Sequence, residues 1–89
     1  TDEAKLELTE KLEDYLYDIF EILKTAPIAR IKDSAKRRDV KLSSVVVAAK
    51  SLADKGLINY QKYGYITLTD RGLEIAKEIE NKRKFSINF

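Results

Sequence analysis

Hydrophobic residues recur every three or four positions near the start of the chain, a spacing that predicts an amphipathic helix. The members of this stripe are Leu8, Leu12, Tyr15, Ile19 and Ile22, widened by Leu16, Phe20 and Leu23. Proline inside a helix removes a backbone donor and clashes with the preceding turn. Because Pro27 follows the stripe, we expect this first helix to cover about residues 9–24.

A second, shorter helix is predicted from Lys32 to about Asp39, packed through Ile31, Ala35 and Val40. A third helix is predicted from the N-cap residue Ser43 to about Lys55. Gly56, which follows directly, is suited to the C′ position that ends a helix. A helical wheel separates its two faces. The inner face consists of Val45, Ala48, Ala49 and Leu52, supported by Leu57. The outer face consists of Ser43, Ser44, Val46, Val47 and Lys50.

In the stretch "LINYQKYGYITLT", the spacing of the hydrophobic residues changes from every three or four positions to every second position. This alternation predicts two strands, and "QKYG" between them reads as a hairpin loop with Gly64 at a positive φ. Thr69 is then a suitable N-cap for a last helix over about residues 70–85. The apolar residues expected on its inner face are Leu73, Ile75, Ala76 and Ile79.

The resulting order is helix, helix, helix, β-hairpin, helix, which is typical of a winged helix-turn-helix. We expect one mainly α domain with a small β-hairpin over residues 1–89, with the helix-turn-helix at about 31–55 and the wing at about 57–69. In this fold a helix about 10 Å across fits the major groove of DNA, and the hairpin reaches a neighbouring part of the duplex. The same order of elements also serves protein-interaction modules.

Composition narrows the classes of function. The chain has no cysteine and no histidine, which excludes disulfides, Cys/His zinc sites and histidine-dependent acid–base catalysis. No glycine-rich phosphate loop and no nucleophile–base pair can be named, so we expect a protein that is not an enzyme. The sequence has no apolar run of roughly 18 residues and no signal-peptide pattern, from which we expect a cytoplasmic protein without membrane contact.

Charge is unevenly distributed along the chain. Residues 1–23 carry eight acidic and two basic residues, a net charge of −6, whereas residues 24–50 carry eight basic and two acidic residues, a net charge of +6. A concentrated basic segment beside the expected reading helix indicates a phosphate-facing surface. The predicted phosphate contacts are Arg30, Lys32, Lys36, Arg37, Arg38, Lys41 and Lys50, with Lys62 and Tyr63 in the wing. For Tyr63 the alternative is a packing role in the hairpin.

The outer face of the reading helix predicts how bases are contacted. Ser43 and Ser44 can hydrogen-bond a phosphate or a base edge from the helix N-terminus, where the helix dipole favours anions. Val46 and Val47 cannot form hydrogen bonds, so their expected role is apolar contact with thymine methyl groups. The alternative is that both valines are buried against another subunit or domain.

Three stretches resemble the N-terminal half of the diphtheria-toxin-repressor and manganese-regulator (DtxR) family. They are "LEDYLYDIFEIL", "ARIKDSAKRRDVKLSSVVVAAKSLADKGLI" and "YGYITLTDRGLEIAKEI", which together span about residues 9–85. The resemblance implies a metal-dependent transcriptional repressor that binds palindromic double-stranded DNA as a homodimer, with no small-molecule substrate. The family's dimerisation region would lie beyond Phe89, so we expect the natural chain to be longer. The family usually has apolar residues where Ser34 and Arg38 stand, so either this helix shifts or Arg38 points along the surface toward phosphate.

The resemblance also implies positions for metal ligands, and this chain matches few of them. Asp14 falls on the ligand position of the first helix, but Tyr17 and Arg83 stand where the family has Glu and His. Mn²⁺ and Fe²⁺ take several oxygen or imidazole ligands, and adjacent Asp18 would supply only a second carboxylate. We therefore expect no metal site and no cofactor in this chain, with Asp14 a solvated helix residue.

Two other functions fit the same fold. A stand-alone dimeric regulator of the multiple-antibiotic-resistance (MarR) type would dimerise through its first helix and its "FSINF" end. A winged-helix interaction module would show no salt-dependent binding to duplex DNA, which distinguishes it from both regulators.

Overall fold

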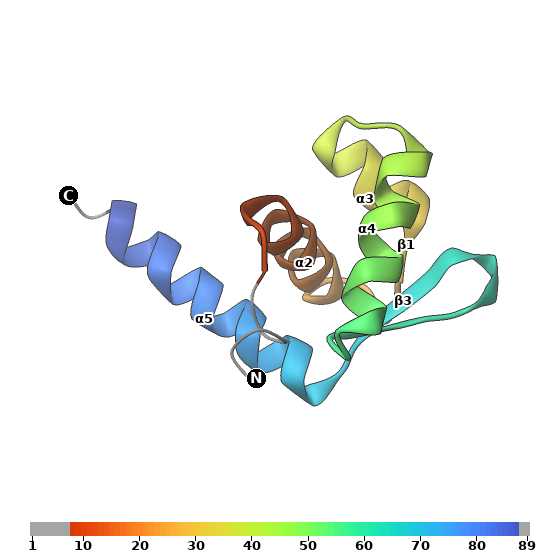
Figure 1. Cartoon of the computed structure of the whole chain (residues 1–89). Helices are drawn as coiled ribbons and strands as arrows, with labels where there is room; N and C mark the ends of the chain where they lie inside the picture. The colour runs from red at the N-terminus through yellow and green to blue at the C-terminus, as the bar shows by residue number, and fades with distance from the viewer. Residues whose placement is uncertain (1–7, 88–89) are drawn as a thin grey trace.

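The computed structural model describes residues 8–87 and places helices around a small sheet (Figure 1). In chain order the elements are α2 (Glu10–Leu23), β1 (Ala29–Arg30), α3 (Ile31–Arg38), α4 (Leu42–Asp54), β2 (Ile58–Tyr60), the 3-10 turn η1 (Lys62–Gly64), β3 (Tyr65–Leu68) and α5 (Asp70–Ile87). This is the predicted winged helix-turn-helix, and each predicted helix lies within a few residues of its expected bounds. The side chains of "FSINF" lie outside the described residues.

Helix α2 is the central element of the core. Thr9 caps it by accepting a hydrogen bond from the Leu12 backbone N–H at 3.1 Å, and this satisfies one of the donors that a helix start leaves unpaired. The predicted stripe is confirmed, with Tyr15, Leu16, Ile19 and Phe20 buried and the others partly buried. The side chain of Asp18 is buried as well, which the stripe does not predict.

Helix α4 begins two residues earlier than predicted. Its N-cap is Lys41, which makes no side-chain capping bond, so Ser43 lies in the first turn and is not the cap. The C-terminal prediction is confirmed: Gly56 has a φ of 76°, and the Leu57 N–H donates to the Leu52 carbonyl at 3.1 Å. That bond pattern is a Schellman closure. The predicted inner face of α4 is buried throughout.

The sheet has a third strand that the sequence pattern did not predict. Its order is β1-β3-β2, with both pairs antiparallel and Ala29 opposite Ile66. Strand β1 contains only two residues, too few to show an alternation of period two. The positive φ expected at Gly64 is confirmed at 77°, and Tyr63 beside it also has a positive φ of 69°.

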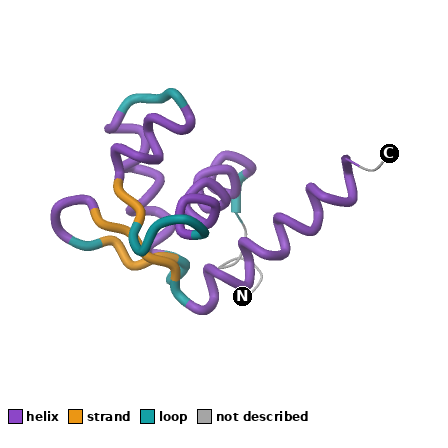
Figure 2. Tube along the Cα trace, turned by 180° about the vertical axis from the view of Figure 1, so that it is seen from behind, coloured by secondary structure: helices purple, strands orange, loops and turns teal. Residues whose placement is uncertain are grey.

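Helix α5 leaves the sheet through a cap that links two loops. The Thr69 hydroxyl accepts a hydrogen bond from the Gly72 N–H at 3.0 Å and donates one to the Gly56 carbonyl at 2.7 Å. The contacts of α5 with α2 continue as far as Arg83, and only its C-terminal end projects beyond the body (Figure 2). Ala76 and Ile79 are buried as predicted, but Leu73 is exposed, because the buried stripe at spacings of four and three begins at Gly72.

Gly72 sits where the backbone of α5 meets the backbone before β2. A Cβ atom at this position would lie 1.8 Å from the Leu57 carbonyl oxygen, so Gly72→Ala forces α5 away from the hairpin. We expect a loss of about 2–3 kcal/mol in the free energy of unfolding, measured by urea denaturation. Gly56→Ala is the control, because a Cβ there meets no atom within 4 Å and only its left-handed backbone is penalised, by about 1 kcal/mol. Equal losses for the two variants would contradict the expected clash.

Candidate nucleic-acid interface

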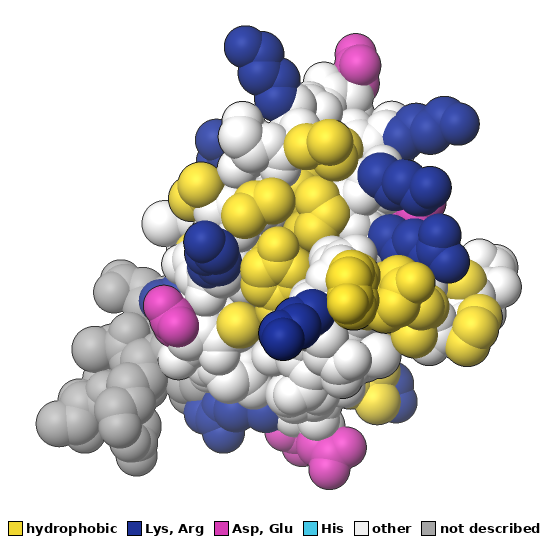
Figure 3. Space-filling model, turned by 90° about the vertical axis from the view of Figure 1, so that its right-hand side faces the viewer, with side chains coloured by type: hydrophobic (Ala, Val, Ile, Leu, Met, Phe, Trp, Pro, Cys, Tyr) yellow, Lys and Arg dark blue, Asp and Glu magenta, His cyan; other side chains and the backbone are white. Residues whose placement is uncertain are grey.

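The outward face of α4 is the centre of the candidate interface. Val47 is 69% exposed, and Ser43 and Lys50 on the same face are also exposed. Figure 3 views the molecule from the side of α3, α4 and the wing, and it shows a band of hydrophobic side chains edged by Lys and Arg. A convex helix with a mixed apolar and basic edge has the shape and charge to enter the major groove of DNA.

Val46 differs from Val47, although the two were predicted to face outward together. Val46 is only partly exposed and packs against the core. It lies in a groove of about 440 Å³ between α4, the start of α3 and the wing. The groove is lined by Arg30, Ile31, Lys32, Leu42, Val46, Tyr60, Tyr63, Gly64 and Tyr65. Sequence analysis missed Leu42, which is 55% exposed, because the helix was expected to begin after it.

The wing presents an exposed aromatic side chain at its tip. Tyr63 is 89% exposed and adopts a left-handed backbone conformation, which is strained for a bulky residue. The neighbouring Gly64 holds the tip against α3, because a Cβ there would lie 3.2 Å from Ile31 Cγ1. Lys62 is exposed beside them. The Arg30 guanidinium lies 5.3 Å from the centre of the Tyr65 ring, a cation–π contact that fixes its direction along the groove.

Two of the predicted phosphate contacts instead face a buried carboxylate. Arg38 donates from Nε to Asp18 Oδ2 at 2.6 Å and from Nη2 to Oδ1 at 3.1 Å, a bidentate pair. Arg37 Nε donates to the same carboxylate at 3.3 Å. The hydrogen bonds to Asp18 raise the pKa of the Arg38 guanidinium. We therefore leave both arginines out of the DNA interface. The Arg38 side chain points toward Asp18 of α2, and not along the surface toward phosphate as one of the two expected placements had it.

The other predicted cations keep their charge available to a ligand. None of the ion pairs found within residues 8–87 engages the side chains of Lys32, Lys36, Lys41, Lys50 or Lys62. All five are exposed. Arg30 is exposed as well, so six of the predicted basic contacts remain candidates.

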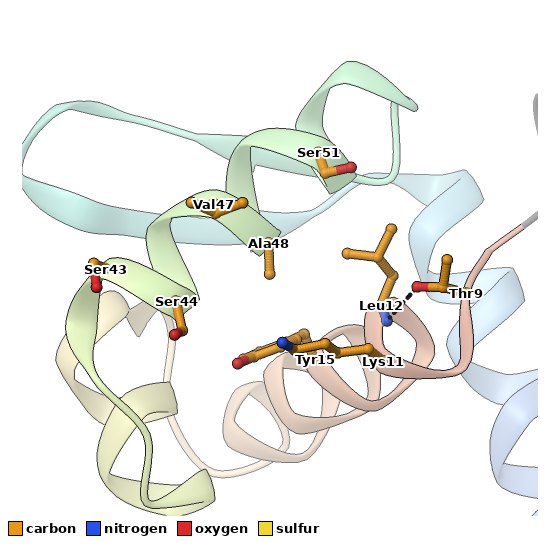
Figure 4. A pocket seen from close by; sticks show the side chains of 9 residues that line it. All are labelled: Thr9, Lys11, Leu12, Tyr15, Ser43, Ser44, Val47, Ala48 and Ser51. Carbon is orange, nitrogen blue, oxygen red and sulfur yellow. Dashed lines mark hydrogen bonds between the residues drawn. The ribbon is translucent and has the colours of Figure 1, made fainter.

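A second hollow borders α4 on the side facing α2 (Figure 4). Its lining consists of Thr9, Lys11, Leu12, Tyr15, Ser43, Ser44, Val47, Ala48 and Ser51. Ser43, Ser44 and Val47 therefore lie on a ridge with a hollow along its edge. Sequence analysis placed no function on Lys11, because nothing in its sequence neighbourhood shows that the start of α2 lies beside α4.

The predicted metal-ligand positions do not form a metal site. Asp14 is not solvated as expected: it pairs with Arg83 of α5 and lies 3.8 Å from Arg38. The Arg83 guanidinium also lies 4.8 Å from the centre of the Tyr17 ring. Within the described part of the chain, no three His, Cys, Asp or Glu side chains are grouped so as to hold a metal ion. The donors present therefore do not fit Fe²⁺ or Mn²⁺, which need several oxygen or nitrogen ligands.

The helical body, the exposed α4 ridge with the lysines around it, and the wing define a winged helix-turn-helix DNA-binding domain. Comparison with known families agrees: the N-terminal DNA-binding domain of the iron-dependent repressors matches residues 7–66. This chain belongs to that family, and the resemblance to the DtxR group is confirmed. No helix within residues 8–87 combines the length and apolar character needed to cross a membrane.

Curated relatives are longer than this chain. An uncharacterized HTH-type transcriptional regulator of Methanocaldococcus jannaschii is 39% identical over 79 residues, covering 86% of this chain and 62% of that protein. The HTH-type transcriptional regulator MntR of Lysinibacillus sphaericus is 28% identical over 81 residues, or 91% of this chain and 58% of that protein. MntR of Listeria monocytogenes is 31% identical over 71 residues, covering 80% of this chain and 50% of that protein. The chain thus spans half to three fifths of the length of these relatives.

Proposed function

We propose that this chain binds duplex DNA as the DNA-binding domain of a transcriptional repressor, with α4 in the major groove and the wing on an adjacent stretch of the duplex. The observation that carries the proposal is the exposed ridge of α4, flanked by lysines that no carboxylate of the described chain neutralises. Family membership supports the same function.

Bases are read mainly by the ridge. Ser43 lies in the first turn of α4, where free backbone N–H groups and the helix dipole favour a phosphate or an acceptor on a base edge. Ser44 lies behind Ser43 and is half-buried, so its contribution to DNA contact is smaller. Val47 offers two exposed methyl groups to thymine methyls in the major groove. Val46 supports the ridge from the groove side, so its contribution to DNA contact is smaller than that of Val47.

Phosphates are held by the cations around the ridge. Each phosphate neutralised steepens the dependence of log affinity on log salt by about 0.9. The proposed contacts are Arg30, Lys32, Lys36, Lys41 and Lys50, with Lys62 in the wing. Tyr63 completes the wing contact, because its exposed ring and hydroxyl stand at the tip, where a backbone phosphate or the minor-groove edge is reached.

The complete protein is proposed to act as a cytoplasmic homodimer without catalytic activity. The dimer is supported by the two-fold symmetry that helix-turn-helix dimers share with palindromic operators. Fluorescence anisotropy with random-sequence duplex at two salt concentrations tests DNA binding itself. Affinity that is measurable at low salt and falls steeply at higher salt supports the proposal. An absence of binding at low salt favours the interaction module.

Val47 provides a test of base contact at a single methyl group. On a site selected from random duplex, replacing the contacted thymine with uracil removes one methyl group and is expected to weaken binding about fourfold, since a buried methylene contributes about 0.8 kcal/mol. Val47→Ala should bind the thymine-containing site about as weakly as wild type binds the uracil-containing site. Its affinity should no longer change when this thymine is replaced with uracil. Because Val47 is exposed, the melting temperature should not change. If Val47→Ala still distinguishes thymine from uracil at every position, this contact is wrong.

A further inference from the structure

Helix α5 is joined to the helix-turn-helix by a continuous chain of ion pairs. Arg83 of α5 pairs with Asp14 of α2 and stacks on the Tyr17 ring. Asp14 lies 3.8 Å from Arg38 of α3, and Arg38 forms the bidentate pair with Asp18. The charge of Arg83, near the C-terminal end of α5, is therefore linked through α2 to α3. Helix α3 is the first helix of the helix-turn-helix, and α4 is the second.

The same chain of pairs returns to α5 by a second route. Asp18 also pairs with Arg37, and Arg37 Nη2 lies 3.8 Å from Glu21. Glu21 pairs with Lys24 at 2.8 Å, and Lys24 pairs with Glu80 of α5 at 2.6 Å. The hydrogen bond from Lys24 lowers the pKa of Glu21. Glu80 precedes Arg83 by one helical turn, so both ends of the chain of pairs lie on one face of α5.

We call these side chains, four acidic and four basic, the α5–α2–α3 network. Its formal charges cancel, and every carboxylate in it already has a cationic partner. A divalent cation bound among carboxylates would neutralise them and draw their helices together. Here the guanidinium and ammonium groups of the chain itself perform that neutralisation. A metal ion bound among these carboxylates would compete with the cations that already pair with them: Arg83 at Asp14, Arg37 and Arg38 at Asp18, and Lys24 at Glu21 and Glu80.

We propose that the α5–α2–α3 network replaces a metal ion in this domain: Arg83 is a positioning residue that holds α5 on α2 and orders the helix-turn-helix for DNA without a divalent cation. The DNA part of this proposal rests on the function proposed above. The packing part stands on the ion pairs alone. It differs from what the family description, iron-dependent repression, implies.

The first experiment removes the charge of Arg83 and keeps the length of its side chain. Arg83→Met should speed amide hydrogen exchange in the second half of α5 and in α3, and weaken random-duplex binding about fivefold, a typical coupling between sites. Lys84→Met is the matched control, since Lys84 is exposed on the same helix and should leave both measurements unchanged. Arg83→Lys keeps the charge but loses the planar guanidinium that lies over the Tyr17 ring, so it should fall between wild type and Arg83→Met.

The second experiment tests coupling and metal directly. If the pair is real, Asp14→Asn combined with Arg83→Met should destabilise less than the sum of the single variants. Excess Mn²⁺ or Fe²⁺ should leave the melting temperature of the wild-type chain unchanged, and a chelator should leave its DNA affinity unchanged. A metal-induced rise in melting temperature overturns the proposal, as does additivity of the two variants or unchanged hydrogen exchange in Arg83→Met. If wild type fails to bind DNA at low salt, the proposed function fails, while hydrogen exchange and melting still decide the role of Arg83.

Discussion

Asp18→Ala is expected to destabilise this domain more than the loss of any other acidic side chain in the described part of the chain. The Asp18 side chain is 5% exposed, whereas its partners Arg37 and Arg38 are 44% and 33% exposed. Removing one member of a fully buried ion pair costs about 3–5 kcal/mol because the remaining charge has no partner. Both arginines can turn toward water, so we expect a smaller loss of about 2–3 kcal/mol in the free energy of unfolding.

Chemical denaturation measures this loss, and two further variants identify its cause. Asp18→Asn keeps the shape of the side chain but removes its charge, so it should lose most of the same free energy. Asp54→Ala removes an exposed aspartate from the end of α4 and should change the free energy of unfolding by less than about 0.5 kcal/mol. If Asp18→Ala is as mild as Asp54→Ala, the contact between α2 and α3 does not depend on this pair.

The second large effect is expected on DNA affinity. Substituting Lys32, Lys50 and Lys62 together with alanine removes exposed cations from α3, α4 and the wing. If each contacts one phosphate, the salt slope should fall by about 3 and the affinity near physiological salt by roughly 100-fold. Anisotropy titrations of random duplex over a series of salt concentrations measure both quantities. Stability should change little, because none of the three lies in an ion pair of the described chain.

A charge-matched control separates this surface from the net charge of the protein. Arg71, Lys77 and Lys84 are three exposed cations of α5, and α5 runs from the base of the wing away from the wing tip in Figure 1. Their joint substitution with alanine lowers the net charge by the same amount, so nonspecific attraction alone would weaken binding equally. A control that loses as much affinity as the first triple variant would place the DNA elsewhere on the molecule.

Local patterns in the sequence were sufficient for most of the secondary structure. Apolar spacing gave the stripe of α2 and the inner face of α4, while Gly56, Gly64 and Thr69 marked the turns and the cap at which elements begin and end. These signals depend on neighbours within a few residues, through the helical period, the preference of glycine for positive φ, and capping bonds. The two-residue strand β1 was missed because its partner β3 lies far along the chain.

Which basic residues pair with a carboxylate was decided by the tertiary structure. Lys36, Arg37 and Arg38 are adjacent basic residues in "AKRRD", and the sequence alone does not show which of them pairs with a carboxylate. Asp18 lies on α2, and only the packing of α2 against α3 brings its buried carboxylate to the two arginines. Because a buried charge requires a partner, Arg37 and Arg38 turn toward Asp18, although the Arg37 side chain stays 44% exposed. Lys36 is exposed and lies in no ion pair of the described chain.

The same distinction applies to the valines and to the metal ligands. Helical spacing put Val46 and Val47 on one outward face, but Val46 packs against the core in the groove between α4 and the wing, which leaves Val47 as the exposed residue. The sequence by itself showed that Arg83 stands at a predicted ligand position. Only the fold brings Arg83 onto Asp14 and Tyr17, because the two helices lie far apart along the chain and meet only through tertiary packing.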